Sequence, residues 1–185
     1  MSYQDKWVLG KVIEEGDREC TRRYGIIRDF CKSLGKEKFS VCDIGANWCY
    51  FDFRLTQEFS GCSVVAFEFR VTKAVRDLVR HNKADRIVLL DHKIHLSEMK
   101  VLGEVCSFDV VLALSVIHHL QEPVDELIDG FLKLGQHVIV EFAGDDSARE
   151  TAPPSRHQGK LLGYGDSHLL DGYQRPIVVF SRGNE

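Results

Sequence analysis

From residue 39 onward, the chain alternates between short runs that are apolar throughout and longer stretches that carry apolar residues at helical spacing. A strand that is apolar throughout is buried on both faces, which is typical of parallel sheets covered by helices. The longer stretches predict amphipathic helices near residues 51–59, 71–81, 95–102 and 122–134. The predicted strands are Phe39–Ile44, Ser63–Phe67, Arg86–Leu90, Phe108–Leu114 and Gln136–Glu141.

This alternation of strands and helices predicts an α/β fold with a doubly wound, mostly parallel sheet of the Rossmann-like type. Two more short strands are predicted near Lys160–Tyr164 and Pro176–Ser181. No long helix separates these two, so we expect them to pair antiparallel at the edge and bring the sheet to seven strands. The polar segment Gly144–Pro154 is predicted to be a loop.

Residues 1–38 carry mixed charges and apolar residues at helical spacing, which predicts two short helices ending near Gly35. A chain of 185 residues fits one domain and leaves little for a second. We therefore expect a single domain, 1–185, with an N-terminal helical segment (1–38), a core (39–142), and a C-terminal loop with edge strands (143–185).

The composition is that of a soluble globular protein, with 44% hydrophobic and 28% charged residues. A formal charge of −4 argues against broad, charge-driven binding to nucleic acid or to an anionic membrane. The chain has neither a membrane-length apolar run nor a signal peptide, so we expect a cytoplasmic protein. Its six cysteines include no Cys-x-x-Cys pair and are expected to be reduced and mostly buried, without a metal site.

The first predicted strand leads into the segment Asp43-Ile44-Gly45-Ala46-Asn47, where an open α/β sheet binds its ligands. A pyrophosphate cofactor prefers several glycines here, and a carboxylate would repel its phosphates. S-adenosylmethionine carries an ammonium group and no phosphate. Asp43 can accept hydrogen bonds from its amino-acid end, and Gly45 lets the backbone approach. The loop therefore favours S-adenosylmethionine as cofactor.

The second predicted strand ends in another acid, Glu68, about 20 residues after the loop. A carboxylate at this position can accept both hydroxyls of an adenosine ribose. Either acid alone is more simply explained as a helix cap or a solvated charge. Together, at this spacing and after two apolar strands, Asp43 and Glu68 favour a nucleoside site.

The fourth predicted strand continues into Ser115-Val116-Ile117-His118-His119-Leu120, so Ser115 and both histidines are expected on the substrate side. A neutral histidine can act as a general base or hydrogen-bond a hydroxyl nucleophile. Alternatively, each histidine only starts a helix and is satisfied by the backbone. A metal site would need a third ligand, and none with suitable spacing is evident.

These three ordered motifs resemble class I S-adenosylmethionine-dependent methyltransferases, and most closely their small-molecule and glycan-modifying branch. The similarity covers roughly residues 39–181 and includes the terminal segment Ser167-His168-Leu169. It implies that Asp43, Gly45 and Asn47 hold the methionine part of the cofactor and that Glu68 holds the ribose. It also places Asp91 and His92 beside the adenine.

One position departs from the family, since Cys49 stands where its members usually have the glycine that lets the helix start approach the cofactor. The cysteine could crowd the cofactor or be tolerated as a small side chain. Tyr50 and Trp48 are expected to face the pocket, with Phe51 in the core. Cys49, Tyr50 and Ser115 complete the candidate cofactor-binding residues.

Methyl transfer needs a base only when the acceptor must lose a proton, as a hydroxyl does. His118 is the first candidate for that base, and His119 and Glu141 are the others. We expect methylation at an oxygen of a small molecule, a sugar or a lipid-linked glycan. Two alternatives stay open: a nicotinamide-dependent oxidoreductase, and a non-catalytic methyltransferase-like binding or regulatory subunit.

Overall fold

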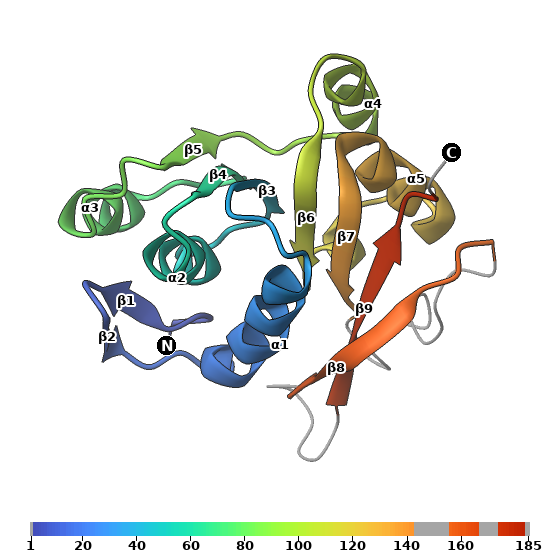
Figure 1. The fold of residues 1–185 in the computed structure, drawn as a ribbon. Helices are drawn as coiled ribbons and strands as arrows, with labels where there is room; N and C mark the ends of the chain where they lie inside the picture. Colours follow the sequence, from blue (N-terminus) through green and yellow to red (C-terminus); the bar gives the residue numbers. More distant parts are fainter. Residues whose placement is uncertain (1, 143–155, 167–173, 184–185) are drawn as a thin grey trace. The chain divides into compact units, whose positions relative to one another are not determined.

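A computed structural model describes residues 2–142, 156–166 and 174–183, and the chain divides into two compact units, Met1–Lys93 and Ile94–Glu185. Figure 1 shows the elements of both units. The boundary between the units falls inside the segment 39–142 that the sequence predicts as the core. The predicted loop Gly144–Pro154 and the segment Ser167-His168-Leu169 lie outside the described residues.

The first unit contains three parallel strands with helices between them. Every strand and helix that the sequence predicts between residues 39 and 93 is present, with bounds shifted by no more than two residues. The strand register pairs Ile44 with Phe67 and Glu68 with Asp91, so the carboxyl ends of the three strands lie in step. The elements are β3 (Phe39–Ile44), α2 (Tyr50–Glu58), β4 (Cys62–Glu68), α3 (Lys73–His81) and β5 (Ile87–Asp91).

The N-terminal segment corrects one prediction. Its second helix is present as α1 (Cys20–Ser33), but the first is replaced by a two-stranded hairpin, β1 (Lys6–Val8) and β2 (Lys11–Glu14). Leu9 and Gly10 form the turn with φ angles of 44° and 90°. A two-residue turn with both φ angles positive matches the twist of a hairpin. The turn, rather than the spacing of apolar residues, therefore decides the local structure.

The hairpin is anchored to α2 and α3, beside which it lies in Figure 1. The Trp7 indole N–H donates to Gln57 at 2.8 Å. The side chain of Asn82 accepts from the Leu9 backbone N–H at 2.9 Å and donates to the Trp7 carbonyl at 2.8 Å. The guanidinium of Arg54 lies 4.4 Å from the centre of the Trp7 ring. These contacts replace the helix packing that the sequence suggested.

The second unit contains the remaining sheet strands, and the antiparallel pair that the sequence predicts is confirmed. β6 and β7 are parallel, β9 is antiparallel to β7, and β8 pairs with β9 at the edge. The elements are α4 (Leu96–Val105), β6 (Phe108–Leu114), the short 3₁₀ helix η1 (Ile117–His119), α5 (Val124–Leu134), β7 (Gly135–Glu141), β8 (Lys160–Asp166) and β9 (Gln174–Ser181).

The predicted fold class, a mostly parallel seven-stranded sheet, is confirmed: the strand order is β5-β4-β3 within the first unit and β6-β7-β9-β8 within the second. The central strands are buried on both faces, as their apolar runs require: Val41 and Cys42 of β3 are fully buried, as are Val110 and Val111 of β6. Five of the six cysteines are buried, Cys106 is exposed, and none of the six, which all lie in the described residues, forms a disulfide. No helix within the described residues is long and apolar enough to cross a membrane.

Candidate functional site

The loop after β3 crosses the end of β4 through two backbone hydrogen bonds. The N–H groups of Gly45 and Ala46 both donate to the Phe67 carbonyl, at 2.8 and 3.1 Å. Gly45 has a φ of 80°, a left-handed conformation that glycine adopts without steric cost. The single glycine of the loop is therefore required by the turn itself.

Asn47 and Glu68 come together at this turn. The Asn47 backbone N–H donates to Glu68 Oε2 at 2.7 Å, and the Arg70 N–H donates to Glu68 Oε1 at 3.2 Å. A carboxylate has about four acceptor positions, so Glu68 retains capacity for a ligand's hydroxyls. The Asn47 side-chain oxygen is buried without a hydrogen-bond partner among the described residues. This orphaned acceptor fits a ligand that brings its own donor.

Cys49 precedes α2 in the left-handed conformation, with φ 58° and ψ 27°, and is fully buried. For a residue with a side chain this conformation costs about 1–2 kcal/mol relative to the right-handed one. The backbone therefore has the shape that suits the family's glycine, although a cysteine occupies it. Burial raises the pKa of the Cys49 thiol well above its ordinary value, and the negative charges of Asp52 and Asp43 raise it further.

Asp43 and Asp52 form a buried pair of carboxyl groups under the loop. Asp43 is 2% exposed and Asp52 is fully buried. Burial raises the pKa of Asp43 well above its ordinary value, and the neighbouring carboxyls of Asp52 and Glu68 add to the shift, whereas Arg23 opposes it. Burial likewise raises the pKa of Asp52 to about 7. Asp52 is not among the residues that the sequence singled out.

The sequence held one signal for Asp52. An acid in the first turn of a helix is normally read as a favourable surface charge at the helix N-terminus. Its neighbours Tyr50, Phe51 and Phe53 are large and apolar, however, and all are buried. A helix start that is apolar on every side leaves no exposed face for the acid.

Asp91 is the last residue of β5 and His92 follows it, beside the end of β4. Asp91 Oδ1 accepts from the Val71 N–H at 3.1 Å, and Oδ2 pairs with Arg76 at 2.9 Å, which holds the chain that leads into α3. The His92 N–H donates to the Glu68 carbonyl at 3.0 Å. Phe69, next to Glu68, is 71% exposed. An aromatic ring and a histidine therefore flank the chain around Glu68.

Tyr50 is fully buried, unlike a residue on an open pocket wall. Its hydroxyl accepts from Arg54 at 2.7 Å and lies 3.3 Å from the Thr21 hydroxyl on α1. Its ring meets those of Trp7 and Phe51 edge-on, with centroids 5.9 and 5.4 Å away. This position favours a packing role within the first unit. Trp48 is partly exposed, with Lys6 Nζ 4.5 Å from the centre of its ring.

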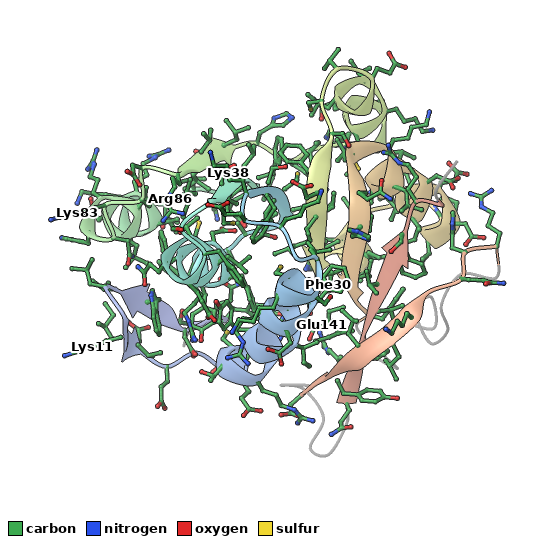
Figure 2. The ribbon with its side chains drawn as sticks, in the orientation of Figure 1. Lys11, Phe30, Lys38, Lys83, Arg86 and Glu141 are labelled. Carbon is green, nitrogen blue, oxygen red and sulfur yellow. The ribbon has the colours of Figure 1, made fainter. Side chains whose placement is uncertain are left out.

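A second polar cluster lies in the second unit, at the ends of β6 and β7. Its members Ser115, Glu141 and Arg175 are 6%, 0% and 2% exposed. The Ser115 hydroxyl donates to Glu141 Oε2, and Arg175 Nη1 donates to Ser115 Oγ at 3.3 Å. Figure 2 labels Glu141. The register of β6 and β7, which pairs Leu114 with Glu141, brings the end of β7 beside Ser115.

Arg175 is a member of this cluster that the sequence placed in the C-terminal tail without giving it a role. It lies 60 residues from Ser115 in the chain, so no local pattern links them. The available signal was an arginine directly before the predicted strand Pro176–Ser181, which is mostly apolar. A buried arginine needs acceptors, which implies an acidic partner.

His118 and His119 lie in η1, immediately after β6, and both are exposed. Their ring centroids are 3.9 Å apart with a tilt of 47°. The His119 N–H donates to the Val116 carbonyl at 2.9 Å, which closes the turn. The imidazoles are therefore accessible to a molecule from solvent. In the described part of the chain, no three His, Cys, Asp or Glu side chains are grouped so that they could hold a metal ion.

Comparisons with known proteins identify the fold. No protein-family model matches the chain, and no curated protein matches it in sequence. The solved structure of WbdD, a bifunctional kinase-methyltransferase, is similar with a TM-score of 0.69 and 20% identity over 90% of this chain. The chain spans only 40% of WbdD.

Two shorter proteins are similar over most of their length. Magnesium protoporphyrin IX methyltransferase (ChlM) from Synechocystis PCC 6803, solved with S-adenosylhomocysteine, has a TM-score of 0.64 and 14% identity, with 89% of this chain and 83% of that chain covered. The N-methyltransferase NodS from Bradyrhizobium japonicum WM9, also solved with S-adenosylhomocysteine, has a TM-score of 0.62 and 14% identity, with 90% of this chain and 88% of that chain covered. The chain therefore has the fold of S-adenosylmethionine-dependent methyltransferases.

Proposed function

We propose that the chain is an S-adenosylmethionine-dependent methyltransferase whose first unit binds the cofactor. The observation that carries the proposal is the loop after β3, where Asn47 donates to Glu68 and keeps an orphaned buried acceptor. The donors and acceptors fit this cofactor, because acids and an amide oxygen suit an ammonium group and ribose hydroxyls. The fold of the methyltransferase structures supports the same assignment.

Each residue of the loop has a distinct proposed role. The Asp43 carboxyl accepts hydrogen bonds from the ammonium group of the cofactor, Gly45 gives the close backbone approach, and Asn47 binds the methionine part. Glu68 holds the ribose hydroxyls through acceptor positions that its backbone donors leave open. His92 and Asp91 border the adenine, although both Asp91 oxygens already accept hydrogen bonds.

The second unit supplies the residues proposed to act on the acceptor. When bound, the cofactor supplies an activated methyl group, so the protein's task is to position the acceptor and accept its proton. His118 takes a proton from an acceptor hydroxyl, with its neighbour His119 as the second candidate. Exposure of both imidazoles supports this role. Glu141 is fully buried and bonded to Ser115, which favours holding the strand ends over proton transfer.

The proposed acceptor is a small molecule, a sugar or a lipid-linked glycan that is methylated at oxygen. WbdD is a kinase-methyltransferase, ChlM a magnesium protoporphyrin IX methyltransferase and NodS an N-methyltransferase, and this variety supports a range of acceptors for the fold. The negative formal charge of this chain, −4, supports an acceptor other than nucleic acid.

Calorimetric titration with S-adenosylmethionine and S-adenosylhomocysteine tests the cofactor assignment. We expect binding by the wild type and at least a tenfold weaker affinity in Asp43→Asn, because the amide cannot balance an ammonium charge. Asp77→Asn is the matched control, since Asp77 lies on the outer face of α3 and pairs with Lys73. Absence of binding by the wild type would overturn the proposal.

A non-catalytic methyltransferase-like subunit is the second candidate, favoured by one observation. Cys49 places a buried side chain at a left-handed position where a glycine would leave room. If this side chain excludes the cofactor, Cys49→Gly should bind S-adenosylhomocysteine while the wild type does not. Equal affinity in the two proteins would argue against this candidate.

A further inference from the structure

The buried pair Asp43 and Asp52 has too few hydrogen-bond donors. Neither oxygen of Asp52 accepts a hydrogen bond of good geometry from an N–H or O–H group in the described part of the chain. Instead, the Asp43 carboxyl and the Cys49 thiol face it within hydrogen-bonding reach. A thiol is only a weak donor, and an ionised carboxyl is an acceptor only.

Two ionised carboxylates cannot face each other in a buried site without a large cost, whereas one shared proton turns the contact into a hydrogen bond. The charged groups around the pair come from two other elements. Glu68 at the end of β4 adds negative charge, and Arg23 on α1 adds positive charge. Cys49, which directly precedes α2, keeps its proton because its surroundings are buried and acidic.

We propose that Asp52 is a positioning residue that shares one proton with Asp43, and that binding of an ammonium group at Asp43 displaces this proton to solvent. The inference rests on the proposed function, since the ammonium group is that of the cofactor. The exchange is balanced: the carboxyl pair loses one proton and gains one cationic donor. The raised pKa values of both aspartates are consistent with one proton being retained near neutral pH.

The exchange makes cofactor affinity depend on pH. If binding releases one proton, the dissociation constant falls by up to tenfold for each unit of pH increase below the pKa of the pair. The dependence should end at the pKa of the pair, above which the free site has already lost the shared proton, and affinity should fall again once the cofactor's own amino group loses its charge. Methylthioadenosine contains the nucleoside without the amino-acid end, so its binding should release no proton.

Calorimetry in two buffers with different ionisation enthalpies counts the protons released on binding. At pH 6.5 we expect close to one proton for S-adenosylhomocysteine and none for methylthioadenosine. In Asp52→Asn the amide donates to Asp43 without needing a shared proton, so the release should fall below half a proton for each S-adenosylhomocysteine bound. Asp77→Asn, the surface control, should release as much as the wild type. Equal release for both ligands, or no release for S-adenosylhomocysteine, would overturn the inference.

Infrared difference spectroscopy on the free protein separates this inference from the proposed function. A shared proton predicts the carbonyl stretch of a buried protonated carboxyl near neutral pH, lost in Asp52→Asn and kept in Asp77→Asn. A band without S-adenosylhomocysteine binding would overturn the proposed function and, with it, the displacement step. Binding without the band would overturn the shared proton and leave the proposed function intact.

Discussion

Both units bury acidic side chains near the carboxyl ends of sheet strands, but they compensate them in opposite ways. In the second unit, Glu141 accepts from Ser115, which in turn accepts from Arg175, so acceptors and donors alternate. In the first unit, Asp52 faces a second carboxyl and receives no strong donor from the described residues. The chain itself supplies the donors for Glu141, whereas Asp43 and Asp52 depend on a proton or on a ligand. Buried polar groups that lack internal partners are therefore the better indicator of a binding site.

The largest expected effect is the loss of Arg175. Arg175→Met removes a buried positive charge beside Ser115 and Glu141 and should lower the free energy of unfolding by about 3 kcal/mol. Urea denaturation followed by circular dichroism measures the change. Arg156→Met is the control, because the exposed Arg156–Asp129 pair should contribute less than about 1 kcal/mol. Equal losses in the two variants would show that the Arg175 cluster does not stabilise the unit.

Asp52→Asn should raise the free energy of unfolding at alkaline pH, whereas Arg175→Met lowers it. The folded pKa of Asp52, about 7, lies above its unfolded value, so the folded state binds more protons between about pH 4 and 7. Wild-type stability should therefore decrease as pH rises through this window. At pH 8 the variant should be more stable than the wild type by about 2 kcal/mol, and at pH 4 the gain should vanish. Urea midpoints across this pH range check both the wild-type trend and the gain in the variant. A gain that persists at pH 4 would contradict the raised pKa of Asp52.

Substitutions at Cys49 should give a smaller effect. Cys49→Ala and Cys49→Gly both remove the thiol, but only glycine relieves the left-handed backbone, so the glycine variant should be more stable than the alanine variant by about 1 kcal/mol. At Ala46, a buried position of the same loop without a positive φ, glycine should be less stable than alanine. If the alanine form is more stable than the glycine form at both positions, the backbone at Cys49 is not strained.

Asp91 provides the smallest effect, because its carboxylate is half-exposed and already has donors. Asp91→Asn should lower the free energy of unfolding by about 0.5 kcal/mol, a typical value for a surface ion pair. The fall should disappear in high salt, which thermal melts at two ionic strengths would measure. A salt-independent loss would indicate that the hydrogen bond to Val71, rather than the pair with Arg76, dominates.

Much of the fold could be predicted from the sequence, because strands buried on both faces produce uninterrupted apolar runs. The bounds of β3 and β6 agree with the predicted Phe39–Ile44 and Phe108–Leu114. The hairpin was missed because its turn uses Leu9, a residue that rarely adopts a positive φ. Regular elements thus follow from pattern, whereas turns depend on individual backbone angles.

The candidate site was predictable in part. Asp43 and Glu68 were found because strand ends in this fold point to one edge, a property of topology. Asp52 and Arg175 were missed, because burial of a charged group depends on packing between distant segments. A sequence shows that a residue is acidic, but not that its neighbours leave it without water.

The anchoring of Trp7 in the hairpin has a practical consequence. The other tryptophan, Trp48, follows the loop after β3, so both tryptophans of the chain belong to the first unit. Fluorescence excited selectively at tryptophan therefore observes that unit alone, while far-ultraviolet circular dichroism observes both. If the two units melt together, the two optical signals will superimpose. If they melt separately, the gap between the curves will show which unit opens first.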